Sequence, residues 1–260
     1  MLVVVVYLAI YLGAGRLAGT IAPDATRARL LSSPGAVFFQ LTFGLLVGAL
    51  VLAIFLSFTG WWRELFARQP ISGSRWMWIA VVVVALPVLL RLFGIDYGRY
   101  PSGVVAVVFA TGLLIGFAEE VLTRGIAVKM LRDSGNSEWV VAAVSSLVFA
   151  VMHSLNLLSG GSPLVVAVTV LYAFGFGVLM YLSMRVSGFL LVALVLHGLT
   201  DPTTILATGG LDELAPDATQ NILLTIASPF NNIVIVTGLI LLIFIRGRVP
   251  RRQDALATAS

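Results

Sequence analysis

Cysteine is absent from this sequence of 260 residues, and its absence excludes several kinds of chemistry. Without a thiol, the chain can form no disulfide, no thiolate metal site and no cysteine nucleophile, and it has no cysteine to palmitoylate. Any metal ion would have to be held by His, Asp or Glu side chains. The sequence also lacks the G-x-S-x-G pattern of serine hydrolases and the HExxH helix of soluble zinc proteases, so neither mechanism has support.

Charged residues are also scarce. They make up 11% of the chain, against about 25% in ordinary soluble domains, whereas 59% of the residues are hydrophobic and the mean hydropathy is +1.04. Most of the chain is therefore expected to lie in a lipid bilayer. A net charge of +4 would favour nucleic acid in a soluble protein, but the basic residues here lie in short segments between apolar stretches, which is typical of membrane topology. We expect no nucleic-acid partner.

The apolar stretches predict an all-α fold, a polytopic transmembrane helical bundle of about eight helices. Crossing about 30 Å of hydrocarbon takes roughly 20 residues at 1.5 Å per residue, and eight stretches come close to or exceed that length. The predicted spans are 1–19, 35–60, 76–95, 102–131, 137–158, 163–185, 188–207 and 221–245. The first begins without the basic segment of a secretory signal, so we expect a retained helix.

Basic residues in the connections predict the orientation of the bundle, because cytoplasmic connections carry an excess of Lys and Arg. The C-terminal tail is expected in the cytoplasm because it holds Arg246, Arg248, Arg251 and Arg252. Alternating spans then place on the same side Arg63, Arg68, Arg75, Arg124, Lys129, Arg132 and Arg185. We expect an integral, multi-pass protein of a bacterial plasma membrane with both termini in the cytoplasm.

Ionisable residues inside the predicted spans are the strongest functional signal. Such groups are costly in a bilayer, so they call for pairing or function. Three spans concentrate them, at Glu119, Glu120, Arg124, His153, His197 and Asp201. Both histidines of the chain are in this set. A single membrane histidine often only makes an interhelical hydrogen bond, but two histidines together with three carboxylates favour a functional site.

Helical spacing predicts how these side chains are grouped. Glu120 and Arg124 are four residues apart, so they share a helix face and can form an ion pair with a structural role. Glu119 is rotated from Glu120 by about 100°, which frees it to face another helix as the candidate general base. His197 and Asp201 are also four residues apart and can act on one bound group.

The fourth and fifth predicted spans form an antiparallel hairpin centred on Gly135. Glu119 lies 16 residues before this glycine and His153 lies 18 residues after it, so their depths differ by roughly 3 Å and the two groups can meet. Phe149, one turn before His153, is expected to wall the site by packing. Pro202, on the seventh span, either distorts the helix beside Asp201 or ends the span.

Three motifs on separate spans carry a family resemblance. They are EExxxR at Glu119–Arg124, FxxxH at Phe149–His153 and HxxxD at His197–Asp201. In this order they resemble the CPBP family, also called ABI, which comprises CAAX prenyl proteases and bacteriocin-processing or self-immunity proteins. The resemblance covers roughly residues 102–205 and implies an intramembrane endopeptidase with a catalytic four-helix core.

The resemblance also implies roles for single residues. Glu119 and His153 would activate water, and His197 with Asp201 would stabilise the oxyanion. The family often has Asn at the last position, whereas an ionised Asp201 can only accept hydrogen bonds, so it must be protonated, orient His197 or help bind a cation. The resemblance leaves both a glutamate-type and a metal-dependent mechanism open. In the second, Glu119, His153 and His197 would be a plausible ligand set for zinc.

These inferences divide the chain into three parts. Residues 1–100 are N-terminal transmembrane helices, residues 101–207 are the catalytic core, and residues 208–260 are an acidic loop, a last transmembrane helix and a basic cytoplasmic tail. The expected partner is a membrane-anchored peptide or protein, prenylated or leader-type, because a buried site is reached most easily from the bilayer. The alternative function is a proton- or cation-coupled transporter or binding protein that uses the same Glu and His cluster.

Overall fold

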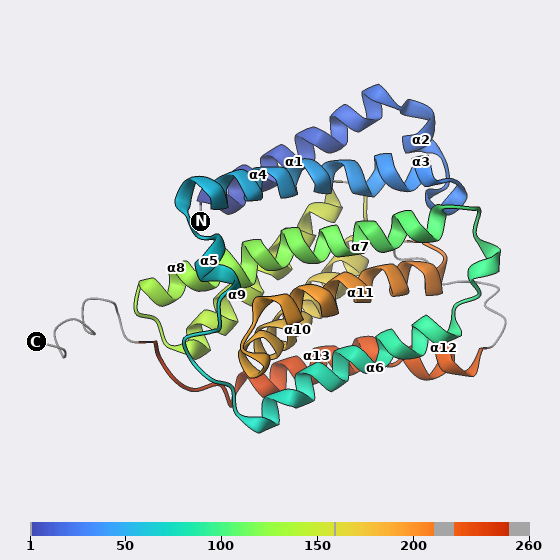
Figure 1. Ribbon diagram of the computed structural model, residues 1–260. Coiled ribbons are helices and arrows are strands. Elements are labelled where there is room, and N and C mark those ends of the chain that lie inside the picture. The colour runs from blue at the N-terminus through green and yellow to red at the C-terminus, as the bar shows by residue number, and fades with distance from the viewer. Residues whose placement is uncertain (1, 159, 211–220, 250–260) are drawn as a thin grey trace, which may run out of the picture. The chain divides into compact units, whose positions relative to one another are not determined.

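The computed structural model describes residues 2–158, 160–210 and 221–249, and within these residues the chain is built from helices without a named strand (Figure 1). Eight helical segments are long and apolar enough to cross a membrane: Val3–Ile21, Pro34–Thr59, Arg75–Gly94, Val104–Asp133, Glu138–Leu157, Pro163–Ser187, Leu190–Thr208 and Ile222–Leu242. Their ends agree with the predicted spans within three residues. The all-α, polytopic helical bundle is therefore confirmed.

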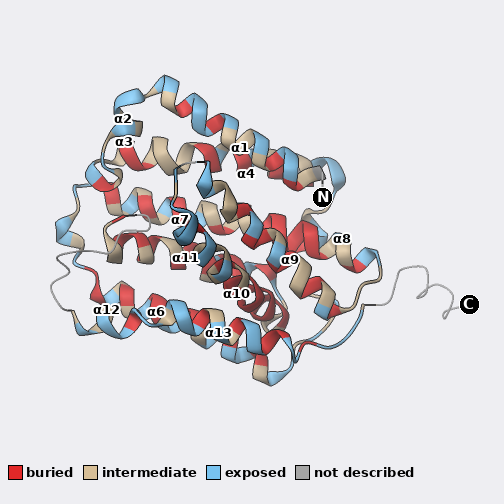
Figure 2. Cartoon of the chain, turned by 180° about the vertical axis from the view of Figure 1, so that it is seen from behind, coloured by how far each residue is buried: buried red, intermediate tan, exposed pale blue. Residues whose placement is uncertain are grey.

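Large apolar side chains cover the outside of these helices. Phe58, Phe93 and Leu164 are 88%, 77% and 75% exposed, and exposed positions recur along most of the long helices (Figure 2). A helix that is apolar on its exposed side as well as its packed side is unfavourable in water and suits lipid. The chain is an integral, multi-pass membrane protein.

The residues group into two compact units, neither of which is one continuous stretch. The first unit comprises Met1–Trp62, Ala85–Ala118 and Leu194–Pro229, and the second comprises Arg63–Val84, Glu119–Ala193 and Phe230–Ser260. The three-part division made from the sequence stays a prediction. Its acidic residues Asp212, Glu213 and Asp217, like Arg251 and Arg252 of its tail, lie outside the described residues.

The first unit holds the N-terminal helices α1 (Leu2–Ile21), α2 (Pro23–Arg27), α3 (Pro34–Val37) and α4 (Phe43–Thr59), parts of α6 (Trp78–Gly94), α7 (Val104–Glu120) and α11 (Leu190–Thr208), and α12 (Ile222–Ala227). Helices α1 and α4 lie side by side (Figure 1). Glycines permit this close approach, since a Cβ on Gly48 would lie 2.6 Å from the Tyr7 ring. Small residues at such contacts are the usual means of packing helices in a bilayer.

Helices α7 and α11 approach each other even more closely within the first unit. A Cβ on Gly112 would lie 2.5 Å from the carbonyl oxygen of Gly198 and from the Pro202 ring, and one on Gly116 would lie 2.4 Å from the carbonyl oxygen of Leu194. This contact uses one face of α11, from Leu194 through Gly198 to Pro202. Helix α11 continues through Pro202 to Thr208, so the interpretation in which Pro202 ends the span is wrong.

A hydrogen bond joins the C-terminal end of α11 to the connection before α7. The Tyr100 hydroxyl donates a hydrogen bond to the carbonyl oxygen of Leu206. Burial raises the pKa of this phenol above its ordinary value, so Tyr100 keeps the proton that it donates. The bond fixes the connection before α7 against the end of α11.

The second unit is centred on α10 (Pro163–Ser187), which packs against α9 (Glu138–Met152) and α13 (Phe230–Leu242). The unit also holds most of α5 (Trp62–Phe66) and α8 (Val128–Asp133). Its contact with α13 again uses glycines, because a Cβ on Gly238 would lie 2.4 Å from the Gly175 carbonyl oxygen. The C-terminal half of α10 is almost wholly buried (Figure 2), so it forms the core of this unit.

The α8–α9 hairpin turns at Gly135, whose φ of +76° is easily adopted only by glycine. Buried charges hold its two arms together, because Arg132 donates two hydrogen bonds of 2.9 and 2.7 Å to Glu138. Tyr181 of α10 donates to the same carboxylate. The hairpin is thus fixed to the core helix of the second unit.

Candidate functional site

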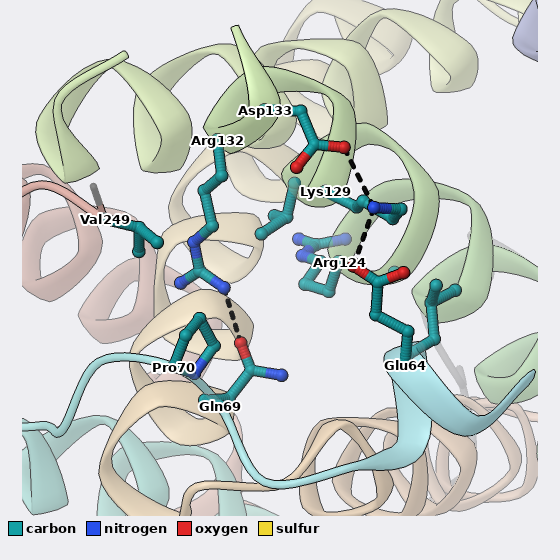
Figure 3. Close-up of a pocket in the computed structure, with 11 residues that line it drawn as sticks. Glu64, Gln69, Pro70, Arg124, Lys129, Arg132, Asp133 and Val249 are labelled. Atoms are coloured by element: carbon teal, nitrogen blue, oxygen red, sulfur yellow. Dashed lines mark hydrogen bonds and ion pairs between the residues drawn. The ribbon is translucent and has the colours of Figure 1, made fainter. Parts of the chain in front are cut away.

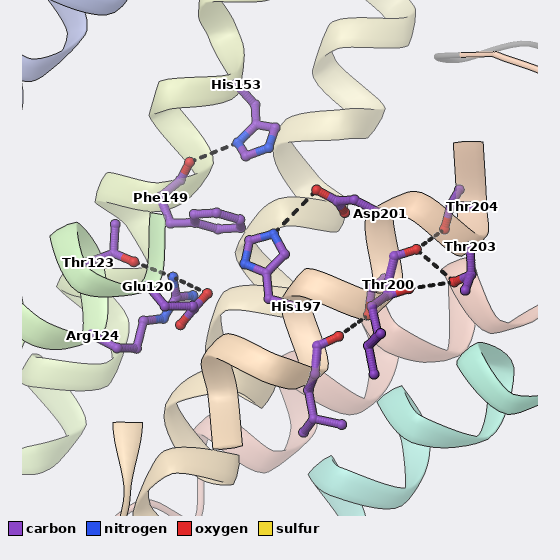
Figure 4. A network of polar contacts seen from close by, with 12 residues as sticks. Glu120, Thr123, Arg124, Phe149, His153, His197, Thr200, Asp201, Thr203 and Thr204 are labelled. Carbon is purple, nitrogen blue, oxygen red and sulfur yellow. Dashed lines mark hydrogen bonds and ion pairs between the residues drawn. The ribbon is translucent and has the colours of Figure 1, made fainter. Parts of the chain in front are cut away.

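The predicted site residues divide between the two units. Glu119 and Glu120 end α7, Arg124 lies in a π-helical turn, and His153 begins a 3-10 turn after α9; all four belong to the second unit. His197 and Asp201 lie on α11 in the first unit. Each group is therefore described by itself (Figure 4).

A π-helical turn, η5 (Val121–Ala127), directly follows Glu120, and all seven of its residues are buried. Such turns are rare in helices and occur often at functional sites. The Leu65 side chain packs closely against this turn, because a Cβ on Gly125 would lie 2.5 Å from it. The sequence did not predict this turn. It widens the helix between the two glutamates of the first motif and Arg124.

Glu120 and Arg124 form the ion pair that their spacing predicted. The carboxylate Oε1 and the guanidinium Nη1 are 3.3 Å apart, and both side chains are 0% exposed. Glu119 differs from its neighbour because it is only half-buried. The two adjacent glutamates therefore have different surroundings, one in a closed ionic contact and one partly exposed.

Arg124 makes two further contacts inside the second unit. Its Nη1 donates to the Thr123 hydroxyl, and that hydroxyl donates to the Glu119 carbonyl oxygen at 2.5 Å. Its guanidinium carbon also lies over the Phe149 ring, 4.6 Å from the centroid. A buried cation over an aromatic face is favourable. Arg124 therefore connects the first motif to the second.

His153 is held by the residue one turn before it. Its Nδ1 lies 3.0 Å from the Phe149 carbonyl oxygen, and the two rings meet edge to face with centroids 4.8 Å apart. Phe149 thus does more than the packing that the sequence predicted. The sequence reasoning missed this role, as it missed Thr123, because a backbone carbonyl has no signature in the sequence and a helix threonine has many ordinary uses.

His197 and Asp201 face each other along α11 in the first unit. Their Nε2 and Oδ2 atoms are 3.6 Å apart, with the imidazole 3% and the carboxylate 34% exposed. This distance is long for a hydrogen bond, so the contact is an ion pair only when His197 is protonated. The neighbouring Thr200, Thr203 and Thr204 donate to carbonyl oxygens of their own helix, which satisfies their hydroxyls in a low-dielectric setting.

A metal site was one of the alternatives left open by the sequence. No group of three or more His, Asp or Glu side chains placed to hold a metal ion occurs within the described parts of the chain. The ligand set Glu119, His153 and His197 takes residues from both units, so it stays a prediction, and a metalloprotease is not supported.

A cavity of about 190 Å³ opens in the second unit beside Arg124 (Figure 3). At its rim, Lys129 contacts Glu64 at 2.6 Å and Asp133 at 2.9 Å. The Arg132 guanidinium donates to Gln69 at 2.6 Å as well as to Glu138. Every cation that lines the cavity thus already contacts a carboxylate, so the cavity has no excess positive charge with which to bind an anion.

Comparison with known proteins supports the interpretation of the motifs. No curated protein and no solved structure matches this chain. Residues 101–203 match the family model described as type II CAAX prenyl endopeptidase Rce1-like, a segment that contains all three motifs. The match gives no support to the transporter alternative. The family of this model is the CPBP family, the same family that the three motifs resemble.

Proposed function

We propose that this protein is an intramembrane endopeptidase that hydrolyses peptide bonds of membrane-associated peptides, using Glu119 and His153 to activate water and His197 and Asp201 to stabilise the oxyanion. The observation that carries the proposal is the match of residues 101–203 to a family of CAAX prenyl endopeptidases. That segment holds all the ionisable residues that the spans concentrate. Buried ionisable groups in a membrane protein otherwise need an explanation.

Water activation is assigned to the second unit. The half-buried carboxylate of Glu119 takes a proton from water while His153 positions the same molecule. The oxygen of that water adds to the peptide carbonyl carbon, whose π electrons move to its oxygen. Glu119 then delivers the proton to the departing amine as the carbon–nitrogen bond breaks. Glu120 and Arg124 hold the end of α7 through their buried ion pair.

Oxyanion stabilisation is assigned to the first unit. His197 donates a hydrogen bond to the developing negative oxygen. Of the three roles that the sequence left open for Asp201, orienting His197 has the most support, because its carboxylate lies 3.6 Å from Nε2 of that residue and is 34% exposed.

Substrate and topology form part of the same proposal. The substrate is a membrane-anchored peptide or protein, prenylated or leader-type, since a site on transmembrane helices is most easily reached from the bilayer. The excess of Lys and Arg in alternate connections favours a plasma membrane location with both termini in the cytoplasm. A bacterial source agrees with the size of the chain.

A cleavage assay on protein reconstituted in liposomes tests the proposal, with prenylated and leader-type peptides as substrates and products identified by mass spectrometry. The Glu119→Gln and His153→Ala variants should each lose about 10²- to 10⁴-fold in kcat, the usual contribution of a general base. Glu64→Gln, which changes an exposed carboxylate, should keep full activity.

Two results would count against the proposal. Cleavage that is unchanged in Glu119→Gln would remove this carboxylate from the chemistry. Cation-coupled uptake by the same liposomes, without peptide cleavage, would favour the transporter. Metal content and activity measured before and after chelation test the metal-dependent mechanism that the sequence left open. Activity that only zinc restores would contradict a glutamate-type mechanism without a metal.

A further inference from the structure

The imidazole of His153 has a defined partner on one nitrogen. Its Nδ1 lies 3.0 Å from the carbonyl oxygen of Phe149, as Figure 4 shows. A carbonyl oxygen can only accept a hydrogen bond, so Nδ1 must carry the hydrogen. In a neutral imidazole, the other nitrogen then has a free lone pair. The contact therefore selects one of the two neutral forms of His153.

The backbone explains why this carbonyl is open to the ring. In an α-helix the amide of His153 would donate to the carbonyl oxygen of Phe149, four residues earlier. Here α9 ends at Met152, and the amide of His153 donates instead to the carbonyl oxygens of Ala150 and Val151. The change from α to 3-10 geometry thus leaves the Phe149 carbonyl available to the side chain.

The aromatic ring of Phe149 restrains the imidazole a second time. It meets the His153 ring edge to face and packs against Phe176 with centroids 6.2 Å apart. Arg124 lies over it at 4.6 Å and is 1% exposed. A planar guanidinium that is both stacked and ion-paired leaves the phenyl ring little freedom to rotate.

Arg124 reaches Glu119 as well. The Thr123 hydroxyl has one hydrogen, which it gives to the Glu119 carbonyl oxygen, so a lone pair of the same oxygen accepts from Arg124. One buried side chain is therefore connected to the backbone of Glu119 and, through Phe149, to the ring of His153. These are the two residues to which the proposed function assigns the water.

We propose that the Phe149 carbonyl and Arg124 hold His153 with its proton on Nδ1, so that Nε2 accepts a hydrogen bond from the attacking water. The consequence for catalysis rests on the proposed function. The water then donates one hydrogen bond to Glu119, which takes that proton, and one to His153 Nε2, so both oxygen lone pairs stay open toward the peptide carbonyl. The opposite tautomer would donate to the oxygen and occupy one of these two lone pairs. Arg124 is a positioning residue.

Nitrogen NMR tests the tautomer directly, because the chain has only two histidines. Protein labelled with ¹⁵N in its histidine rings is compared with the His197→Gln variant, in which every ring signal belongs to His153. In the neutral ring, Nδ1 should show its bonded proton and Nε2 the chemical shift of an unprotonated nitrogen. A predominantly Nε2-protonated ring would overturn the inference.

Arg124→Lys tests the positioning role, with Arg132→Lys as the matched control. Lysine keeps the charge beside Glu120 but cannot stack as a planar fork, so a second, Nε2-protonated signal should appear. The kcat should fall about 10- to 100-fold with KM nearly unchanged, as expected for a misplaced catalytic group. Arg132 pairs with Glu138 rather than with the Phe149 ring, so its variant should keep the His153 signals of the parent protein.

The outcomes separate the two proposals. If both lysine variants change the His153 signals equally, the effect is a general loosening and the role of Arg124 is overturned. If Arg124→Lys changes neither the signals nor kcat, it is overturned as well. If the parent protein shows the Nδ1-protonated ring but cleaves no peptide, the tautomer assignment stands and the proposed function fails.

Discussion

The two groups of motif residues are held by different means. In the second unit, Glu120, Arg124, Phe149 and His153 form a continuous series of short contacts between buried or half-buried side chains. In the first unit, His197 and Asp201 share one contact of 3.6 Å, and the carboxylate is partly open to solvent. The helix beneath this second group is held close to α7 by glycines. Short side-chain contacts thus position the first group, and close backbone packing underlies the second.

Removing one member of the buried ion pair should have the largest effect on stability. In Arg124→Met, the buried Glu120 carboxylate loses its contact with the guanidinium, and breaking comparable buried ion pairs costs about 3–5 kcal/mol. Thermal unfolding in detergent micelles measures the loss. The double variant Glu120→Gln with Arg124→Met should recover much of it, because both members of the pair are then neutral. If Arg124→Met alone is as stable as the parent protein, the contacts of Arg124 do not position the group in the second unit.

Hydropathy and motif spacing account for much of what the structure contains. The eight spans follow from the length of apolar segments, and the Glu120–Arg124 pair follows from a separation of four residues. The alternating side of each connection is still only a prediction. These features depend on local sequence, which is why they could be predicted without coordinates.

Other features depend on contacts that the sequence does not display. The π-helical turn at Val121–Ala127 is made of ordinary apolar and small residues, and nothing in their order distinguishes it from an α-helix. The link from Tyr181 to Glu138 joins residues 43 positions apart. The hydrogen bond from His153 to Phe149 needs a 3-10 turn that frees a backbone carbonyl. These features come from tertiary packing rather than from helix propensity.

Glycine substitutions test whether backbone packing positions the group on α11. An alanine at Gly116 would place its Cβ 2.4 Å from the Leu194 carbonyl oxygen, and rigid backbone atoms cannot move aside as a flexible side chain can. We expect Gly116→Ala to cost about 1–3 kcal/mol, the usual penalty of overpacking, and to lower peptidase activity by displacing His197. Gly19→Ala on α1 is the control, because a Cβ there meets nothing within 4 Å. Equal unfolding temperatures for the two variants would contradict close packing of α7 against α11.

The smallest change in stability is expected from substitution of Asp201, the more exposed member of the His197–Asp201 pair. Asp201→Asn should change the free energy of unfolding by less than about 1 kcal/mol, since an ion pair with a partly exposed carboxylate contributes little. Its effect on activity is more informative. Asparagine keeps an acceptor oxygen beside His197 and can also donate to an oxyanion, so Asp201→Asn should retain most of the kcat that Asp201→Ala loses. If Asp201→Asn is as inactive as Asp201→Ala, the negative charge of Asp201 is itself required. The charge of this group would then matter more for activity than its position.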